Sequence, residues 1–513
     1  MLNGGGINPD GLSLDLQFAA DKTFSKPSSL AAGETAITSR RGPSATFLRL
    51  SGATEVGPDG LIRYAPENLL PRSENFLSWS GWTTFGTSIQ SVTSPNPFGG
   101  STSYKLIESA ANEEHGVVRA SAITTGLANE SIYAKEAGRR FCCLMSDAIT
   151  LAVFDLIDGT VTQVSSGTTA SISSVGNGWF RLSFTSQIAG NYVFKLSNAG
   201  TGISVNTSYL GDGTSGVLIW GAQLERHPTA RAYIPTTTAT VYGPRFDHDT
   251  ASPFACRGLL IEEQRTNSVF PSETLTTQTR TVTAVPHTLS FYGTGTVVLS
   301  GVHSATVNGT GAYPTRTTLT FTPTAGSLTL TVTGSVTQAQ LEAGSFPTSY
   351  IPTTIGPVTR SADVCSITGG AFSGFYNQTS CTVIAKFTTS TISAPTSVCG
   401  TNDPRDIEMQ MIGGGNIVGL SANLGGGTSQ LERSGVVIGE NQRFAFASQS
   451  SNQAICLNGG AVLASPSWLK SATAPTLFYI GRAGFGGQYS GVISMLSVYR
   501  KRLPNAKLQS LTT

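Results

Sequence analysis

The strongest constraint in this sequence is a phrase that the chain uses twice. It reads "AQLERHPTARAYIPTT" at Ala222–Thr237 and "AQLEAGSFPTSYIPTT" at Ala339–Thr354. The blocks that these phrases close also open alike, with "NLLPRSE" at Asn68–Glu74 and "NSVFPSE" at Asn267–Glu273. A shared opening and a shared ending predict two modules of one fold, of which the second is a shortened version. In each module we expect "AQLE" to be the last core strand and the proline of "YIPTT" to end it.

The runs between these phrases have the pattern of β-strands. The first block holds "SIYAKEA", "WFRLSFTS" and "GVLIWGAQLE", separated by the turn signals "DGT", "GNG" and "GDGTSG". The end of the chain adds "SCTVIAKFTT", "RFAFASQS" and "YSGVISMLSVYRKRL", and a short helix candidate at "PNAKLQSL". Such strands, without long helical periodicity, predict an all-β fold: tandem β-sandwich (jelly-roll) modules followed by a third sandwich at the C-terminus.

These patterns divide the chain into five parts. We expect a first sandwich over residues 67–240, a linker over 241–266, a shortened second sandwich over 267–354 and a third sandwich over 355–513. Residues 1–66 are rich in Gly, Ser and Pro and alternate apolar and polar residues only briefly. This segment can bury too little to fold alone, so we expect it to pack on a neighbour, either a later domain or another subunit.

Composition excludes several classes of protein. Charged residues make up only 12% of the chain, the net charge is +2, and no basic block is present. Nucleic acid is therefore not expected as a partner, since phosphate binding needs clustered positive charge. No apolar stretch is long enough for a membrane-spanning helix, and the first residues do not have the pattern of a signal peptide. The seven scattered cysteines predict unpaired buried thiols, although a Cys381–Cys456 or Cys365–Cys399 bridge stays open.

Several phrases resemble proteins of tailed bacteriophages. "NLLPRSENFLSW", "SIYAKEAGRRF" and "IWGAQLE…YIPTT" are similar to carbohydrate-binding-like modules of phage fibre, spike and decoration proteins. "PRFDHDTASPFACRGLLIEEQRTN" resembles the linking segment of the same proteins. "LFYIGRAGFGGQYSGVISMLSVYRKRLPNAKLQSL" resembles the closing strands of a concanavalin-like (laminin-G-like) lectin domain, which assigns the third sandwich to that class.

The resemblance implies a virion structural protein, assembled in the host cytoplasm and exposed on the virion surface. It implies a homo-oligomer, most often a trimer, that joins other virion proteins through residues 1–66 and touches host surface polysaccharide. Two alternatives remain: an architectural decoration, collar or tail component without a ligand, and a polysaccharide depolymerase. We expect no enzyme, because no pair of carboxylates in the sequence argues for glycoside hydrolysis.

Sugar binding by a sandwich uses aromatic rings beside fixed hydrogen-bonding groups, so the five tryptophans are the first candidates. Trp468, in "SPSWLK", and Trp79 and Trp82, in a Ser/Gly-rich stretch, are the candidate glycan-binding residues. Trp179 and Trp220 lie in apolar or turn-flanked strands, and we expect them to fill the core.

Acidic clusters have structural interpretations. "FDHD" places Asp247 and Asp249 on one side of an extended segment, with Arg245 as the expected partner of one of them. Adjacent Glu262 and Glu263 point to opposite faces of a strand and cannot flank one glycosidic bond, so we expect an ion pair at a module junction.

The two "AQLE" glutamates, Glu225 and Glu342, predict a shared structural hydrogen bond. No cofactor is expected. A calcium site at Asp212, Asp403 or Asp406 stays open, because these turns have too few carboxylates for a dedicated calcium loop.

Overall fold

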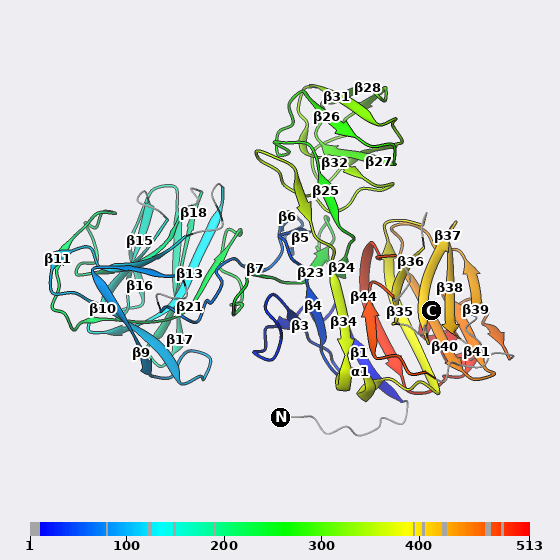
Figure 1. Ribbon diagram of the computed structural model, residues 1–513, viewed down its shortest axis with the longest axis horizontal. Helices are drawn as coiled ribbons and strands as arrows, with labels where there is room; N and C mark the ends of the chain where they lie inside the picture. The colour runs from blue at the N-terminus through cyan, green and yellow to red at the C-terminus, as the bar shows by residue number, and fades with distance from the viewer. Residues whose placement is uncertain are drawn as a thin grey trace. The chain divides into compact units, whose positions relative to one another are not determined.

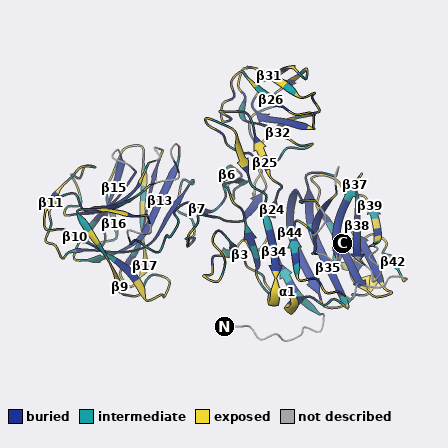
Figure 2. Ribbon diagram, in the orientation of Figure 1, coloured by how far each residue is buried: buried dark blue, intermediate teal, exposed yellow. Residues whose placement is uncertain are grey.

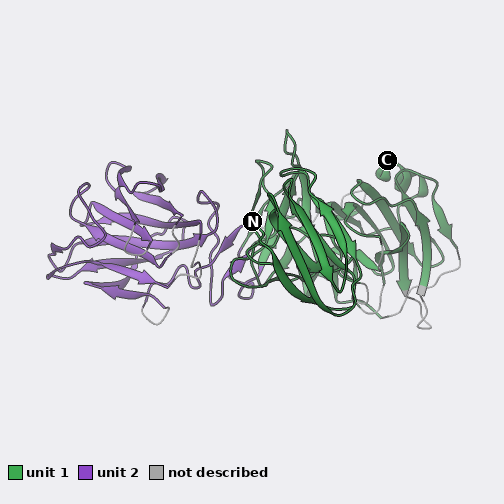
Figure 3. Ribbon diagram, turned by 90° about the horizontal axis from the view of Figure 1, so that it is seen from above, with its two compact units in different colours: residues 1–25, 35–65, 243–513 green, residues 26–34, 66–242 purple. Residues whose placement is uncertain are grey.

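The computed structural model describes residues 11–77, 81–120, 123, 126–146, 150–187, 190–392, 395–402, 406–422, 428–466, 473–483 and 487–513. These residues are almost entirely antiparallel β-structure, and the all-β prediction is confirmed. The chain forms two compact units, coloured separately in Figure 3. Unit 1 consists of Met1–Ser25, Thr35–Ala65 and Gly243–Thr513, and unit 2 of Lys26–Glu34 and Pro66–Tyr242. No helix in the described part of the chain is both long and apolar enough to cross a membrane.

Unit 2 is a sandwich of two six-stranded sheets with its core between them. The first sheet has the order β17 (Thr169–Gly176), β18 (Trp179–Ser186), β13 (Ala128–Ala137), β21 (Gly216–Glu225), β10 (Thr102–Glu108) and β9 (Thr87–Thr93). The second has the order β16 (Thr160–Val164), β15 (Thr150–Asp155), β14 (Phe141–Ser146), β19 (Tyr192–Ser197), β12 (Gly116–Arg119) and β8 (Thr83–Phe85). Two short pairs complete it: β11 (Asn112–Glu113) with β20 (Tyr209–Leu210), and β7 (Glu67–Asn68) with β22 (Val241–Tyr242).

Unit 1 contains a larger sandwich. Its eight-stranded sheet has the order β23 (Arg245–His248), β24 (Cys256–Ile261), β44 (Gly491–Tyr499), β35 (Ser380–Thr389), β40 (Gln442–Gln449), β41 (Gln453–Leu457) and β42 (Leu463–Ser465), with β1 (Leu12–Leu16) also paired to β44 (Figure 1). Its nine-stranded sheet has the order β2 (Phe24–Ser25), β3 (Thr35–Ile37), β4 (Ala45–Leu48), β34 (Val364–Thr368), β43 (Leu477–Ile480), β36 (Thr396–Thr401), β37 (Glu408–Gly413), β38 (Asn416–Ala422) and β39 (Thr428–Ser434). The hairpin β5 (Thr54–Val56) with β6 (Ile62–Tyr64) and the helices α1 (Gly369–Phe375) and α2 (Asn505–Thr512) belong to the same unit.

Two segments predicted to lie outside this sandwich are strands of it. Residues 1–66, expected as a separate attachment segment, contribute β1, β3 and β4, and the expected linker 241–266 contributes β23 and β24. Leu14 and Leu16 of "LSLDLQF" are fully buried in the same core as Leu259. Figure 2 shows β35 and β38 of this sandwich as mostly buried. The boundaries failed because the partners are remote: Leu12 of β1 pairs with Tyr499 of β44. Of the two neighbours considered for residues 1–66, the later domain is the one that they pack on.

The shortened module belongs to unit 1 and has its own core. A four-stranded sheet, β26 (Gln278–Val282), β31 (Gly326–Thr333), β28 (Thr296–Gly301) and β29 (Ala305–Asn308), faces a three-stranded one, β30 (Thr317–Phe321), β27 (His287–Tyr292) and β32 (Thr337–Ala343). The chain enters and leaves through the paired strands β25 (Arg265–Asn267) and β33 (Val358–Arg360). Both repeated modules are therefore insertions into the large sandwich, each on a two-stranded stem.

The repeated phrases form the same clasp in both modules. The Asn68 amide donates to the carbonyls of Ala222 (3.1 Å) and Ile234 (2.8 Å). The Asn267 amide donates in the same way to Ala339 (3.0 Å) and Ile351 (2.9 Å). In each module, the asparagine that begins the opening phrase thus bonds to both parts of the closing phrase, "AQLE" and "YIPTT".

The "AQLE" residues complete the clasp. Gln223 donates to Glu225 (2.8 Å) and accepts from the Ile234 amide (2.8 Å). Gln340 donates to Glu342 (2.6 Å) and accepts from the Ile351 amide (2.7 Å). The predicted shared structural role of the two glutamates is confirmed.

All seven cysteines are free thiols, as the prediction of unpaired cysteines required. Neither of the two bridges left open by the sequence is formed.

Leu16→Ala tests whether the N-terminal segment belongs to the core. Removal of a fully buried leucine side chain should lower the free energy of unfolding of unit 1 by about 2–5 kcal/mol. Leu50→Ala, in the same segment but 74% exposed, should change it by less than about 0.5 kcal/mol. Differential scanning calorimetry of the full chain measures both variants, and equal effects would contradict the assignment.

Asn267→Ala tests the clasp. It leaves two buried carbonyls and the amides of Val269 and Leu341 without the side chain that pairs them, so stability should fall by at least about 2 kcal/mol. Asn308→Ala is the matched control in the same module, because its exposed side chain accepts one bond from Thr296. Urea unfolding of both variants gives the comparison, and a neutral Asn267→Ala would show that the clasp is dispensable.

Candidate functional site

Of the three tryptophans predicted to bind glycans, one is described. Trp79 and Trp468 lie outside the described residues. Trp82 is only 1% exposed, and its ring packs against Phe76 (centroids 4.9 Å apart) and Tyr192 (5.6 Å) in the core of unit 2. The prediction for Trp82 is wrong, because no face of the ring is open to a ligand.

Trp179 and Trp220 are buried core residues, as predicted. They form a cluster with Tyr133 that is separate from the core between the two sheets. Ile132 and Ala134 face that core, so Tyr133 between them points to the opposite face of the sheet. The sequence could not distinguish these faces, because both carry large apolar side chains.

A loop between β9 and β10 carries a further aromatic ring over this cluster. The Asn96 side-chain oxygen accepts the amides of Phe98 (2.9 Å) and Gly100 (3.0 Å), and the Trp179 indole donates to the Pro95 carbonyl (3.0 Å). The Asn96 bonds hold the loop together internally, and the Trp179 bond attaches it to β18.

Phe98 is 63% exposed although its ring is packed on one side. Its centroid lies 5.2 Å from Trp220 in a stacked arrangement, 5.6 Å from Tyr133 and 5.8 Å from Tyr233. We call these four residues the aromatic platform. Sequence reasoning missed Phe98 and Tyr133. The only signal was "NPFGG", a turn that presents one large apolar residue.

Polar groups surround the platform. The Arg181 guanidinium lies 5.5 Å from the centre of the Tyr133 ring and donates to Ser131 (3.2 Å). The Tyr233 hydroxyl shares a hydrogen bond with Ser73 (2.7 Å). Lys135 shares the face of Tyr133 on β13 and donates to the Asn177 carbonyl (2.7 Å). The platform thus combines an exposed ring with hydrogen-bonding groups close to its other rings.

The acidic turns do not form a calcium site among the described residues. Asp212 accepts bonds from the amides and hydroxyls of Thr214 and Ser215, which lower its pKa and occupy its oxygens. Asp406 is buried and accepts from the Tyr376 hydroxyl, and Asp403 lies outside the described residues. The described residues contain no group of three or more His, Cys, Asp or Glu side chains that could hold a metal ion.

Glu262 belongs to a buried ion network, in agreement with the ion pair that the sequence predicted at a module junction. It accepts from Arg245 (2.6 Å) and Arg360 (2.8 Å). Asp363 pairs with Arg245 and also with Arg49, whose nitrogen lies 3.1 Å from the Asp363 carboxylate. Burial raises the pKa of Glu262, but Arg360 and Arg245 outweigh that effect and hold it at about 2.

The prediction that Arg245 pairs with an aspartate of "FDHD" is wrong. Its aspartate partner is Asp363, 118 residues away, which no local spacing reveals.

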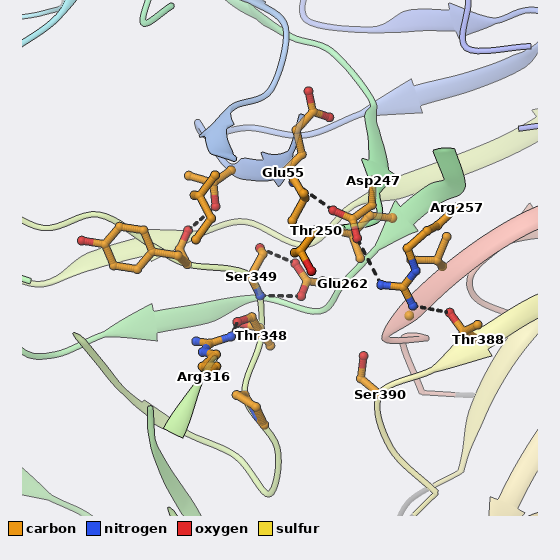
Figure 4. A pocket seen from close by; sticks show the side chains of 18 of the residues that line it. Glu55, Asp247, Thr250, Arg257, Glu262, Arg316, Thr348, Ser349, Thr388 and Ser390 are labelled. Carbon is orange, nitrogen blue, oxygen red and sulfur yellow. Dashed lines mark hydrogen bonds and ion pairs between the residues drawn. The ribbon is translucent and has the colours of Figure 1, made fainter. Parts of the chain in front are cut away.

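Asp247 and Asp249 pair instead with Arg257, at 3.5 and 3.8 Å. Asp247 faces a cleft of about 370 Å³ in unit 1 (Figure 4). The cleft is lined by β5, by β23 and β24, by the shortened module and by the ends of β35 and β44. Burial raises the pKa of Asp247 to about 6, although the Val56 amide and Arg257 oppose that rise.

Comparisons with known proteins give likenesses of shape alone. No protein-family model and no curated protein sequence matches the chain. A sialidase carbohydrate-binding module from Ruminococcus gnavus, solved with α2,3-sialyllactose, is 15% identical over 27% of this chain and 84% of its own, with a TM-score of 0.24. The receptor-binding domain of a botulinum neurotoxin C/D mosaic is 10% identical over 29% of this chain and 39% of its own, also at 0.24.

Mouse laminin α1 domains LG4-5 are 7% identical over 85% of this chain and 92% of their own, with a TM-score of 0.22. We assign neither a family nor a ligand from likenesses of this size.

Asp247→Asn should stabilise unit 1 at alkaline pH. A carboxyl with a pKa of about 6 when folded and 3.8 when exposed holds its proton more tightly in the folded state. Ionisation therefore costs stability as the pH rises through this window, by about 3 kcal/mol above it. Thermal unfolding at pH 8 should show a higher midpoint for Asp247→Asn, and at pH 4 the difference should nearly vanish. An equal shift at both pH values would contradict this assignment.

Proposed function

We propose that the protein binds saccharides through the aromatic platform of unit 2. The observation that carries this proposal is the Phe98 ring, 63% exposed yet stacked on Trp220. An exposed ring supported from behind can pack against the apolar face of a pyranose with little loss of side-chain entropy on binding. The Arg181 guanidinium lies over the Tyr133 ring and the Tyr233 hydroxyl belongs to the platform, so both are near enough to the rings to bond to sugar hydroxyls.

The proposal favours a binding protein over the two alternatives. An architectural component without a ligand does not need an exposed aromatic ring supported by three more rings, and Phe98 is such a ring. A depolymerase needs two carboxyl groups roughly 5–10 Å apart across the scissile bond. Around the platform, the described residues place rings, a guanidinium, an ammonium group and the Glu74 carboxylate, which accepts from the Tyr233 hydroxyl (3.5 Å). One carboxylate by itself does not make such a pair.

We further propose that the protein is a component of a tailed-phage virion, a fibre, spike or decoration protein that contacts host surface polysaccharide. The support is the resemblance of the module and linker phrases, together with the low charged fraction of 12%, which suits large subunit contacts. On this proposal the chain assembles as a homotrimer. Several copies of the platform then bind together, which raises a weak affinity per site.

Phe98→Ala should reduce glycan binding of the full-length protein at least tenfold, because the ring that faces solvent is lost. A glycan array probed with the labelled protein identifies a bound saccharide, and titration of that saccharide gives the ratio of affinities. Leu210→Ala is the control, since Leu210 is a similarly exposed apolar residue of unit 2 (71%) outside the platform. Equal loss in both variants, or none in Phe98→Ala, would contradict the platform.

Light scattering should give a solution mass three times the chain mass of 53.4 kDa. A monomer across the concentration range would contradict the trimer and favour a part that assembles only on the particle.

A further inference from the structure

We propose that the cleft of unit 1 is a second ligand site, which takes one neutral, hydroxyl-rich sugar unit between a tyrosine pair and the side chains of Asp247 and Arg257. This site shares no residue with the aromatic platform and does not rest on the proposed function. Its volume of about 370 Å³ lies at the lower end of small-molecule sites, roughly 300–1,000 Å³, so it suits a single sugar unit.

Asp247 and Arg257 both keep hydrogen-bonding capacity toward the cleft. One Asp247 oxygen accepts the Val56 amide (2.9 Å), and the other lies 3.5 Å from Arg257. The remaining contacts of Arg257 are also long, 3.4 Å to Thr388 and 3.8 Å to Asp249. Charge-assisted bonds are normally about 2.7–2.9 Å, so this pair is under-bonded. Figure 4 shows the two side chains at the same wall of the cleft.

A carboxylate beside a guanidinium matches two neighbouring sugar hydroxyls. Each hydroxyl can donate one bond and accept others, so one can donate to Asp247 while the next accepts from Arg257. Thr250 and Ser390 add hydroxyl groups to the same lining. The hydroxyls of Thr348, Ser349 and Thr389 are already bonded within the protein, and that of Thr388 accepts from Arg257.

The shortened module supplies the aromatic wall. The Tyr292 and Tyr313 rings meet edge to face with centroids 5.2 Å apart, and the Tyr313 hydroxyl donates to the Gly60 carbonyl (2.5 Å). Arg316 is held by the Thr348 carbonyl (2.6 Å) and Ser290 (2.7 Å). These bonds fix the wall before a ligand arrives, which lowers the entropy cost of binding.

The charges around Asp247 argue for a neutral ligand. Glu55 from β5 and Glu262, which follows β24, lie in the same lining as Arg257 and Arg316. Tyr292 and Tyr313 face Asp247 from the shortened module, and Arg245 and His248 share its strand. An anion would meet the carboxylates and a cation would meet the guanidiniums, whereas a polyol can bond to both.

Binding should also depend on pH. Ligand hydroxyls that donate to Asp247 stabilise its ionised form, so its pKa should fall on binding. Affinity is therefore highest above pH 6, and it should weaken as the pH drops through the range in which free Asp247 takes up its proton.

The test uses the full chain with Phe98→Ala as background, which removes the platform from the readout. Saturation-transfer NMR with a panel of neutral hexoses and N-acetylhexosamines at pH 7.5 identifies a bound sugar, and titration gives its affinity. Adding Asp247→Asn or Arg257→Gln should lower that affinity at least tenfold. Asp249→Asn is the matched control, because this exposed aspartate also faces Arg257, and it should change affinity less than twofold.

Three results would overturn the proposal. They are no binding by the Phe98→Ala background, binding that Asp247→Asn and Arg257→Gln leave intact, or preference for an acidic sugar over its neutral counterpart. Lowering the pH from 7.5 to 5 should weaken binding at least fivefold in the background protein and less than twofold with Asp247→Asn. If Phe98→Ala loses binding on the glycan array but still binds the neutral sugar by NMR, the platform and the cleft are two independent sites.

Discussion

The ion network at Asp363 is the interaction on which the arrangement of unit 1 depends. Arg49 precedes the first insertion, Arg245 follows it, Glu262 precedes the second insertion, and Asp363 follows that. All four side chains are buried, so each relies on the others in place of water. Removal of one member of such a network leaves a buried charge unpaired, at a cost of about 3–5 kcal/mol. The network therefore specifies how three separate stretches of chain meet, which hydrophobic burial alone does not.

Glu262 and Asp247 show that the surroundings of a buried carboxylate decide whether it stabilises the fold or remains able to bind a ligand. Glu262 has two short guanidinium contacts and a pKa near 2, so it is ionised and fully bonded. Asp247 has one long guanidinium contact and a pKa near 6, so its charge is poorly compensated. Groups of the second kind concentrate at binding sites, because a ligand can supply the partner that the fold withholds. The cleft also needs the shortened module, whose tyrosines form one wall.

The repeated clasp explains how a fold tolerates two large insertions. Each module begins and ends at a pair of short strands, and one asparagine bonds to both ends of its closing phrase. The entry and the exit of each module therefore lie together at its two-stranded stem. The same device serves a module with two six-stranded sheets and one with sheets of four and three strands. The phrase is thus a property of the junction, independent of module size.

The sequence by itself determined the all-β class, the repeat and the unpaired cysteines. Strand alternation and turn residues are local, and buried thiols need no partner. Tertiary structure decided the rest. Residues 1–66 and 241–266 looked like a tail and a linker because their partners, such as Tyr499 for Leu12, lie almost a whole chain away. Trp82 proved to be core and Phe98 exposed, because both lie outside the strands, where strand alternation does not indicate which side chain is covered. Asp247 and Arg257 meet the tyrosines of a module inserted after them, and only the folded chain brings those groups together.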